Sequence, residues 1–408
     1  MKNIVVIGAG AAGLLCGYFA AAAGASVTLL DKNERPGRKI MITGKGRCNL
    51  TNNCDVRRFM ESVPKNASFL YSALNFLSPT DLIALVENAG LPLKTERGNR
   101  VFPKSDKAVD VVDTLFSLVS SVGCKFRTAK ALRILSEDGR VMGVKTDRGD
   151  FPADAVVIAT GGASYPRTGS TGDGYALAKE LGHTIEPIKP SLVPLVTAGK
   201  GAAKLMGLSL KNVSVTLREK ENGKVLFEDF GEMLFTHFGL SGPIILSSSV
   251  FVRQGEHYTV SLDTKPALSV EELSKRILRD FSENINKDFI NSLDALLPKK
   301  LIPYVVEVSG IPPRKKVNTI TKEERLGFAR LLKSLEFEVV GTRPIDEAIV
   351  TSGGVSVKEI NPKTMMSKLV EDLYFAGEVI DVDALTGGYN LHIAMATGAL
   401  AGASAASD

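Results

Sequence analysis

The chain has 408 residues, of which 44% are hydrophobic and 23% charged, and it contains 38 glycines and 18 prolines. This balance is typical of a globular protein with a large core, and at roughly 150 residues per domain it allows two or three domains. It excludes a disordered chain, a collagen and a coiled coil. Four cysteines in 408 residues are too few for a disulfide framework, which indicates a reducing, cytoplasmic compartment, and there is no C-x-x-C pair to indicate zinc or a dithiol.

The formal net charge is only +5, but the cations gather in two segments. Residues 32–58 contain eight Lys or Arg and two acidic residues, and residues 299–333 contain nine Lys or Arg and three acidic residues. Two such basic segments suit ligands that carry phosphate, or they form a solvated surface.

The N-terminal segment predicts a strand, a helix and a second strand. Residues 3–30 carry no charge, which is also true of signal peptides and membrane spans. However, a glycine turn separates an apolar run at 4–7 from a small-residue run at 14–23, and another apolar run at 26–30 ends on Asp31. A βαβ unit that is buried on both faces is uncharged as well. We therefore predict neither a signal peptide nor a membrane span.

The glycines of this turn have the G-x-G-x-x-G spacing of dinucleotide-binding proteins. Gly8 permits the sharp turn, Gly10 lets the backbone approach a pyrophosphate, and Gly13 allows the helix to pack closely on the strand. The N-terminus of the helix presents free N–H groups and a partial positive charge to the phosphates. Asp31, 18 residues after Gly13, stands where a carboxylate accepts the hydroxyls of the adenosine ribose. The segment therefore predicts dinucleotide binding.

Three later segments favour FAD as the dinucleotide. Residues 155–162 and 373–381 each predict a buried strand that ends in a glycine-containing turn, and residues 387–391 open an Ala- and Gly-rich helix that runs to about 401. A helix N-terminus at the pyrimidine edge of an isoalloxazine would stabilise negative charge on the reduced flavin. The same composition also suits ordinary core packing. The prediction is a cofactor domain built from both ends of the chain.

The middle of the chain predicts an insertion in this domain. Short alternating runs between 192 and 265 indicate strands of a small barrel or sheet, and residues 269–337 show helical periodicity, with Ser269 and Thr321 as helix-capping residues. The predicted fold class is α/β, with a Rossmann-like FAD-binding domain at 1–190 and 340–408, an inserted β-barrel-like subdomain at 191–268, and a small, basic helical subdomain at 269–339.

Taken together, the motifs resemble the BaiN/RdsA family of bacterial FAD-dependent flavoproteins, NAD(P)/FAD-dependent oxidoreductases with FAD domains of the glutathione-reductase type. The resemblance is carried by residues 8–13, 44–52 (GKGRCNLTN), 159–162, 235–243 (FTHFGLSGP), 347–355 and 377–391. It extends from one end of the chain to the other. The resemblance implies bound FAD, an inserted β domain and helical domain, and a redox enzyme.

The motifs and the resemblance give one set of expected cofactor-binding residues. These are Gly8, Gly10, Ala12, Gly13, Asp31, Lys32, Arg38, Gly46, Arg47, Cys48, Asn49, Thr160, Gly161, Gly377, Glu378, Gly388, Tyr389, Asn390 and Leu391.

The resemblance implies more than one substrate class. One branch of the family resembles ribosomal RNA dihydrouridine synthases, which reduce the 5,6 double bond of uracil, and others are described as aminoacetone oxidases or, by analogy, as bile-acid-processing reductases. An RNA backbone could dock on the basic residues at 299–333. The chain has no Trp and only 6% aromatic residues, so extensive base-stacking platforms are not expected. We expect reduction of a uridine in ribosomal RNA. The alternatives are a small-molecule flavin oxidase or reductase of the aminoacetone oxidase type and a non-catalytic flavin-binding redox sensor.

Reduction of uracil needs a hydride from the flavin and a general acid from the protein. Cys48 is the first candidate for this acid, because it lies in a Gly-rich, basic segment where Lys45 and Arg47 would lower its pKa. The alternative is a small packing residue beside the cofactor. His237 is the second candidate, as a proton donor or substrate contact, with a structural histidine as its alternative.

The remaining candidates have simpler interpretations. His392 is expected to tune the flavin or to pack, and His183 and His257 to lie on the surface. No His, Cys or carboxylate group has metal-ligand spacing, so no metal is predicted. Residues 168–174 follow no clear strand, so a nicotinamide domain is not predicted and NAD(P)H is expected at most as a transient reductant. The sequence predicts no membrane partner and does not define an oligomeric state.

Overall fold

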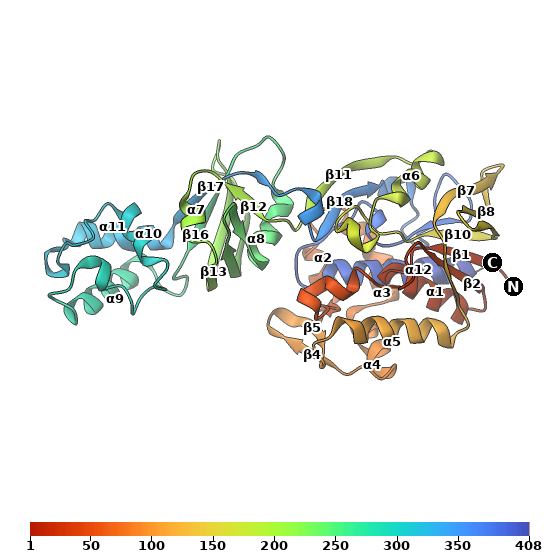
Figure 1. The fold of residues 1–408 in the computed structure, drawn as a ribbon, viewed down its shortest axis with the longest axis horizontal. Helices are drawn as coiled ribbons and strands as arrows, with labels where there is room; N and C mark the ends of the chain where they lie inside the picture. Colours follow the sequence, from red (N-terminus) through yellow and green to blue (C-terminus); the bar gives the residue numbers. More distant parts are fainter. Residues whose placement is uncertain (408) are drawn as a thin grey trace. The chain divides into compact units, whose positions relative to one another are not determined.

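The structure is a computed structural model that describes residues 1–407. The chain divides into two compact units (Figure 1). Unit 1 comprises Met1–Ser191 and Ile345–Asp408, and unit 2 comprises Leu192–Pro344. Both ends of the chain therefore belong to unit 1, and unit 2 is an insertion.

The core of unit 1 is a parallel sheet of five strands in the order β19-β10-β1-β2-β6. The strands are β1 (Asn3–Ile7), β2 (Ser26–Asp31), β6 (Lys125–Thr128), β10 (Ala155–Ile158) and β19 (Leu373–Phe375). In the central register, Ile7 lies opposite both Leu30 and Ile158, and Ile158 lies opposite Phe375. The four strands β2, β1, β10 and β19 therefore end level with one another, at the carboxyl edge where nucleotides bind in sheets of this type.

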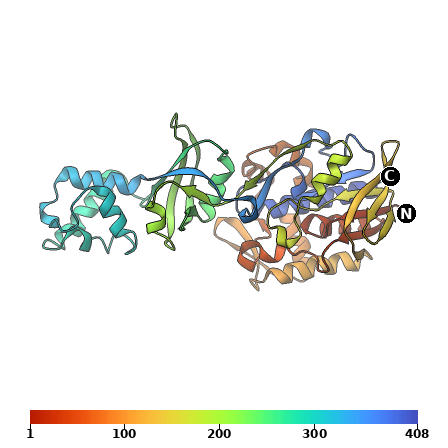
Figure 2. The ribbon, with the colours of Figure 1, turned by 45° about the horizontal axis from the view of Figure 1, so that its top comes forward.

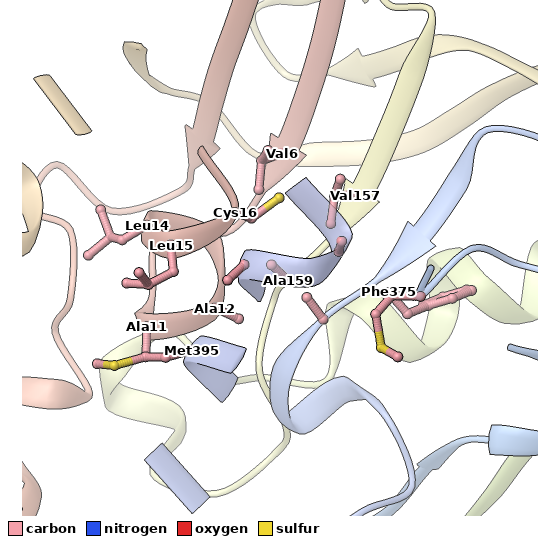
Figure 3. Packing of buried hydrophobic residues seen from close by; sticks show 14 of the residues in the cluster. Val6, Ala11, Ala12, Leu14, Leu15, Cys16, Val157, Ala159, Phe375 and Met395 are labelled. Atoms are coloured by element: carbon pink, nitrogen blue, oxygen red, sulfur yellow. The ribbon is translucent and has the colours of Figure 1, made fainter. Parts of the chain in front are cut away.

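Two helices from opposite ends of the chain, α1 (Ala11–Ala22) and α12 (Tyr389–Ala406), pack together beside this sheet. A Cβ atom on Gly398 would overlap the carbonyl oxygen of Ala12, and one on Gly402 would overlap that of Cys16. Glycine therefore allows the two backbones to approach closely. Side chains of α1, β1, β10 and α12 form one apolar cluster here (Figure 3). The Ala- and Gly-rich helix is confirmed, and it ends a few residues later than predicted.

Smaller elements surround the parallel sheet of unit 1. Its other helices are α2 (Val56–Glu61), α3 (Tyr71–Phe76), α4 (Pro79–Asn88), α5 (Ala108–Ser121) and α6 (Asp173–Glu180). Its small antiparallel sheets are formed by β3 (Thr51–Asn52), β5 (Arg100–Pro103) and β4 (Leu93–Glu96), by β7 (Ala131–Glu137), β8 (Arg140–Thr146) and β9 (Gly149–Pro152), and by β11 (Ile185–Ser191) and β18 (Val350–Val355).

One helical stretch, residues 67–88, is long and apolar enough to cross a membrane by length and composition. It is interrupted within the fold. Leu77 leaves the helical conformation (φ −135°, ψ 88°), and Ser78 forms a capping box that starts α4. Both flanking helices bury side chains in the core of unit 1. The stretch therefore consists of separate short helices that pack against the protein itself.

Unit 2 contains a closed antiparallel barrel whose strands have the order β12-β15-β14-β13-β16-β17. Most of its strands are green in Figure 2. Its strands are β12 (Leu195–Thr197), β13 (Ser209–Glu219), β14 (Val225–Phe235), β15 (Gly239–Ser241), β16 (Tyr258–Asp263) and β17 (Leu335–Thr342), and the short helices α7 (Gly201–Lys204) and α8 (Pro243–Ser248) accompany them. Burial alternates along β16, as expected when every second side chain points into a barrel.

The helices α9 (Val270–Ser282), α10 (Ile302–Ser309) and α11 (Lys322–Lys333) lie together beside the barrel within unit 2 (Figures 1 and 2). Both predicted capping boxes are confirmed: Ser269 accepts from the N–H of Glu272, and Thr321 from that of Glu324. The α/β fold class with a Rossmann-like domain, an inserted barrel and helices is confirmed. The division of unit 2 into two subdomains stays a prediction.

Candidate functional site

The turn after β1 lies between the ends of β2 and β10. The N–H of Gly8 donates to the carbonyl of Leu30 (2.7 Å), and the N–H of Ala159 donates to that of Ile7 (2.8 Å). Gly8 has a φ of +105°, and a Cβ there would overlap the carbonyl of Ala159. A Cβ on Gly13 would in turn overlap the carbonyl of Gly8. The predicted roles of Gly8 in the turn and Gly13 in helix packing therefore agree with the contacts.

The first turn of α1 leaves its backbone N–H groups available. Gly10 is the N-cap, and the first turn has neither a side-chain cap nor an acidic residue. A Cβ on Gly10 would meet no atom of the described chain within 4 Å. An uncapped helix N-terminus beside open space fits a pyrophosphate, because free N–H groups and the helix dipole attract anions. This fit supports a dinucleotide at the turn.

Asp31 ends β2 at the same edge of the sheet. Its Oδ2 accepts a hydrogen bond from the N–H of Ala9 (2.8 Å), and its Oδ1 accepts from the N–H of Asn33 (2.8 Å). These bonds fix the carboxylate next to the glycine turn, and Oδ2 keeps a lone pair for a further donor. A ribose hydroxyl is such a donor, and this contact stays a prediction.

Glu378 joins three segments at this edge. Its Oε1 accepts from the N–H of Thr351 (2.7 Å) and the hydroxyl of Ser164 (3.1 Å), and its Oε2 accepts from the Nζ of Lys39 (2.6 Å). Lys39 also donates to the hydroxyl of Ser164 (2.7 Å). A Cβ on Gly162 would overlap the hydroxyl of Thr351. The predicted site residues did not include Lys39, Ser164 or Thr351. The sequence indicates them only weakly, because Lys39 lies in a basic segment and the other two lie near glycines.

Residues 44–52 pack against the N-terminus of α12. The side-chain oxygen of Asn49 accepts from the N–H of Gly388 (3.0 Å), and its nitrogen donates to the carbonyl of Thr51 (3.1 Å). Asn52 donates to the carbonyl of Gly387 (3.1 Å). Two sequence-distant motifs that carried the family resemblance thus meet at one helix end.

Several predicted cofactor residues direct their polar groups to the protein itself. The partners are Asp173 for Lys32 (2.5 Å), Asn33 for Arg38 (2.6 Å), Glu96 and Asp106 for Arg47, and Ala384 for Asn390 (2.7 and 2.8 Å). The rest of the predicted set lies in the turns and helix starts of the site: Gly46 at the end of a 3-10 helix, Thr160 and Gly161 after β10, Gly377 after β19, Ala12 in α1, and Tyr389 and Leu391 in the first turn of α12. Contact of these residues with FAD stays a prediction.

Cys48 is completely buried, with 0% of its surface exposed. Burial raises the pKa of its thiol to about 12. The predicted lowering of this pKa is wrong, because the Arg47 guanidinium is paired with Glu96 and Asp106 and desolvation disfavours a thiolate. At neutral pH Cys48 is therefore a protonated thiol. Its role as a catalytic acid stays a prediction.

His392 is fully buried in α12. Its Nδ1 lies 3.0 Å from the hydroxyl of Thr51, and its Nε2 lies 3.0 Å from the carbonyl of Leu77. Burial lowers the pKa of the ring to about 4, so the imidazole is neutral at physiological pH. Of its two predicted roles, these contacts favour packing.

The other three histidines differ in exposure. His183 was predicted to lie on the surface, which is wrong: it is 3% exposed and forms a 2.8 Å hydrogen bond with the hydroxyl of Ser367. His257 is exposed, as predicted. His237 is also exposed, between β14 and β15, with its ring centroid 4.9 Å from that of Phe238. His237 is thus accessible to a substrate.

The nine cations at 299–333 fall into two groups. Five have partners within unit 2: Asp263 for Lys333 (2.5 Å), Glu324 for Lys315 (2.6 Å), Asp288 for Lys316 (2.8 Å), Ser274 for Arg325 (3.1 Å), and the carbonyl of Met206 for Lys300. The other four are exposed and have no side-chain partner among residues 1–407: Lys299, Arg314, Lys322 and Arg330. We call these four residues the free cations.

Residues 1–407 contain no group of three or more His, Cys, Asp or Glu side chains that could hold a metal ion.

The fold and the site define the class of this protein. A parallel Rossmann-type sheet has an uncapped helix N-terminus and glycine turns at its carboxyl edge, which is the arrangement of dinucleotide-binding oxidoreductases. The chain belongs to the family described as HI0933-like protein Rossmann domain, which matches residues 2–404. It is an FAD-dependent oxidoreductase. This family confirms the resemblance found in the sequence.

Characterised relatives cover nearly the whole chain. The chain is 32% identical to the 3-dehydro-bile acid delta(4,6)-reductase of Clostridium scindens, over 100% of this chain and 99% of that protein. It is 31% identical to the ribosomal RNA dihydrouridine synthase of Escherichia coli, over 95% of this chain and 94% of that protein. Among solved structures, the quinol fumarate reductase of E. coli aligns with a TM-score of 0.53 at 18% identity, over 99% of this chain and 70% of that chain. The last comparison shows a shared fold.

Proposed function

We propose that this protein reduces a uridine in ribosomal RNA to dihydrouridine. Two relatives, from E. coli and Haemophilus influenzae, are named ribosomal RNA dihydrouridine synthases and are 31% and 32% identical to the chain. The observation that carries the proposal is the set of free cations on unit 2. Four exposed cations that form no ion pair within residues 1–407 suit a chain of phosphates, which a small uncharged substrate does not offer.

The names of the relatives point to one reaction class. Dihydrouridine forms when the 5,6 double bond of uracil, which is conjugated to a carbonyl, is saturated. A 3-dehydro substrate with a delta-4 double bond also has an alkene conjugated to a carbonyl. In both, a hydride adds to an electron-poor carbon and a proton completes the product. We infer that this chain catalyses reduction of an alkene conjugated to a carbonyl.

The residues of the site have separate tasks in this proposal. Bound FAD, once reduced, would supply the hydride. The N-terminus of α1 would hold its pyrophosphate and Asp31 its ribose, and the N-terminus of α12 would stabilise negative charge on its ring. His237 is the proposed proton donor because it is exposed, and Cys48, as a protonated thiol, is the alternative. NAD(P)H is the proposed transient reductant, and a ribosomal RNA substrate would place the enzyme in the cytoplasm.

A small-molecule reductase is the second candidate. The bile acid reductase of C. scindens aligns with all of this chain at 32% identity, a coverage slightly greater than that of the RNA-modifying relatives. No comparable observation favours an aminoacetone oxidase. The redox-sensor alternative is dropped, because the family is one of enzymes.

The test is the dihydrouridine content of ribosomal RNA, measured by mass spectrometry after nuclease digestion, in cells with and without the gene. We expect a dihydrouridine to be lost on deletion and restored by the intact gene. A Gly10→Ala variant should not restore it, whereas Gly327→Ala, at a glycine with an ordinary φ and open surroundings in α11, should. Equal dihydrouridine content in the two strains would contradict the proposal and favour the small-molecule reductase.

A further inference from the structure

Unit 2 contains a cleft of about 280 Å³ where the barrel meets the segment that leads into α10. Its floor is apolar and consists of Leu210 and Val213 from β13 and of Leu297 and Leu301 from the segment before α10. All four side chains are at least nine-tenths buried. A pocket of this size lies near the lower end of the range for ligand sites, roughly 300–1,000 Å³, so it suits a single ring system rather than a dinucleotide.

Two lysines, Lys211 and Lys265, belong to the lining of the cleft. Neither ammonium group has a hydrogen bond or an ion pair with any of residues 1–407. Lys265 is half-buried, and burial, together with the charge of Arg276, lowers the pKa of its amine. A half-buried ammonium without a partner is costly, and an anionic ligand would offset this cost.

The lining contains no acidic side chain that could serve as this anion. The nearest carboxylate in the sequence, Asp263, already forms an ion pair with Lys333 (2.5 Å) and accepts from the backbone N–H of Lys265 (2.8 Å). Pro298 belongs to the lining, and the next residue in the sequence is Lys299, one of the free cations. The cleft is therefore apolar at its floor and cationic at its rim, and the unpaired Lys299 comes directly after one of its lining residues in the sequence.

We propose that this cleft binds one nucleotide of a single-stranded segment of the RNA substrate, with a phosphate at Lys211 and Lys265 and the base or ribose against the leucines. This inference rests on the proposed function, because it names the surface that holds the RNA. The aliphatic floor packs against the flat face of any base, and it presents no aromatic ring and no acidic group. Binding is therefore salt-dependent and tolerant of sequence.

The test uses the purified full-length flavoprotein and a fluorescein-labelled oligouridylate of about twelve nucleotides, with affinity measured by fluorescence anisotropy at about 50 and 200 mM salt. The double variant Lys211→Gln/Lys265→Gln should bind about tenfold more weakly at low salt, and the slope of log affinity against log salt should fall by about one to two. Lys211→Arg/Lys265→Arg keeps both charges and should keep the affinity, which separates lost charge from lost folding.

The matched control is Lys145→Gln/Lys224→Gln, which removes two exposed lysines without side-chain partners among residues 1–407, one from β8 and one from the turn between β13 and β14. This control should bind like the unaltered protein. If the unaltered protein binds the RNA and the Lys211→Gln/Lys265→Gln variant binds it equally well, the cleft proposal is wrong and the proposed function stands. If the unaltered protein does not bind RNA at low salt, both the cleft proposal and the proposed function are wrong. If inorganic phosphate binds the cleft but the variant and the unaltered protein have equal affinity for RNA, the cleft is a simple anion site.

Discussion

The hydroxyl of Thr51 and the Nδ1 of His392 form a buried hydrogen bond of 3.0 Å. The other ring nitrogen, Nε2, lies 3.0 Å from the carbonyl of Leu77, which can only accept, so Nε2 carries the proton and Nδ1 accepts from Thr51. This neutral imidazole joins residues 44–52 to α12 within unit 1. Because the N-terminus of α12 is also held by Asn49, we infer that these bonds fix the helix end that we propose for the flavin ring.

The first prediction concerns the pH dependence of stability. The folded state lowers the pKa of His392 from 6.5 to about 4, so the unfolded chain takes up this proton first as the pH falls. The stabilising contribution is complete above pH 6.5 and is lost between pH 6.5 and about 4, by an amount on the order of 3 kcal/mol. Urea unfolding across this range should show a steeper fall in the free energy of unfolding for the unaltered protein than for His392→Gln.

The control for this prediction is His237→Gln, which removes an exposed histidine that has no ion pair among residues 1–407. Its free energy of unfolding should follow that of the unaltered protein at every pH. Parallel pH profiles for the unaltered protein and His392→Gln would contradict a neutral, buried His392.

The second prediction separates two glycines of the turn after β1. Gly10 has an ordinary φ of −83°, and its Cβ direction is open, so Gly10→Ala should fold normally but obstruct the pyrophosphate. At Gly13 a Cβ would collide with the carbonyl of Gly8, so Gly13→Ala should lower the melting temperature of the apoprotein itself. Flavin content after purification and thermal unfolding of the apoprotein measure the two effects. A Gly10→Ala protein that retains its full flavin content would contradict the proposal that the pyrophosphate occupies the open space beside Gly10.

The third prediction concerns thiol reactivity. Cys48 is completely buried with a pKa of about 12, whereas Cys54 is half-buried with a pKa of about 11. The thiolate is the species that reacts with iodoacetamide, so Cys54 should be alkylated first and Cys48 only after unfolding. Peptide mass spectrometry over time measures the order. Faster alkylation of Cys48 than of Cys54 in the folded protein would show that its thiol is accessible and activated.

The fourth prediction concerns the free cations. Replacing Lys299, Arg314, Lys322 and Arg330 by Gln should weaken binding of a ribosomal RNA fragment and lower the salt slope by about one for each phosphate that is no longer neutralised. The double variant Lys315→Gln/Glu324→Gln removes an ion pair from the same segment without changing its net charge, so it should leave affinity and slope unchanged. Salt titration of RNA binding makes the comparison, and equal losses of affinity in the two variants would show that the free cations have no special role.

Much of unit 1 could be predicted from the sequence because its signals are local. The strand, turn and helix at Gly8–Gly13 depend on neighbouring residues, and so do the capping boxes at Ser269 and Thr321 in unit 2. The bonds of Lys39 to Glu378 could not be predicted, because the two residues are 339 positions apart and meet only when the parallel sheet forms. His183 lacked a local signal for the same reason: it is buried by contacts to Phe375 and Ser367.

Cys48 illustrates a different limit. Its neighbour in the sequence, Arg47, suggested an activated thiol, but in the fold that guanidinium stacks on Phe102 at 4.2 Å and pairs with carboxylates of other segments. Although Arg47 and Cys48 are adjacent in the sequence, the guanidinium of Arg47 therefore does not lower the pKa of the Cys48 thiol. The side-chain direction in such an irregular segment is set by tertiary partners.

The central claim, that a uridine in RNA receives the reducing equivalents, is tested most directly by anaerobic reoxidation. The purified flavoprotein is reduced with dithionite, excess reductant is removed, and the flavin absorbance is followed after addition of ribosomal RNA fragments or of a 3-dehydro bile acid with a delta-4 double bond. We predict that RNA reoxidises the flavin with stoichiometric formation of dihydrouridine, and that the bile acid does not. Reoxidation by the bile acid, with no reaction of the RNA, would contradict the claim.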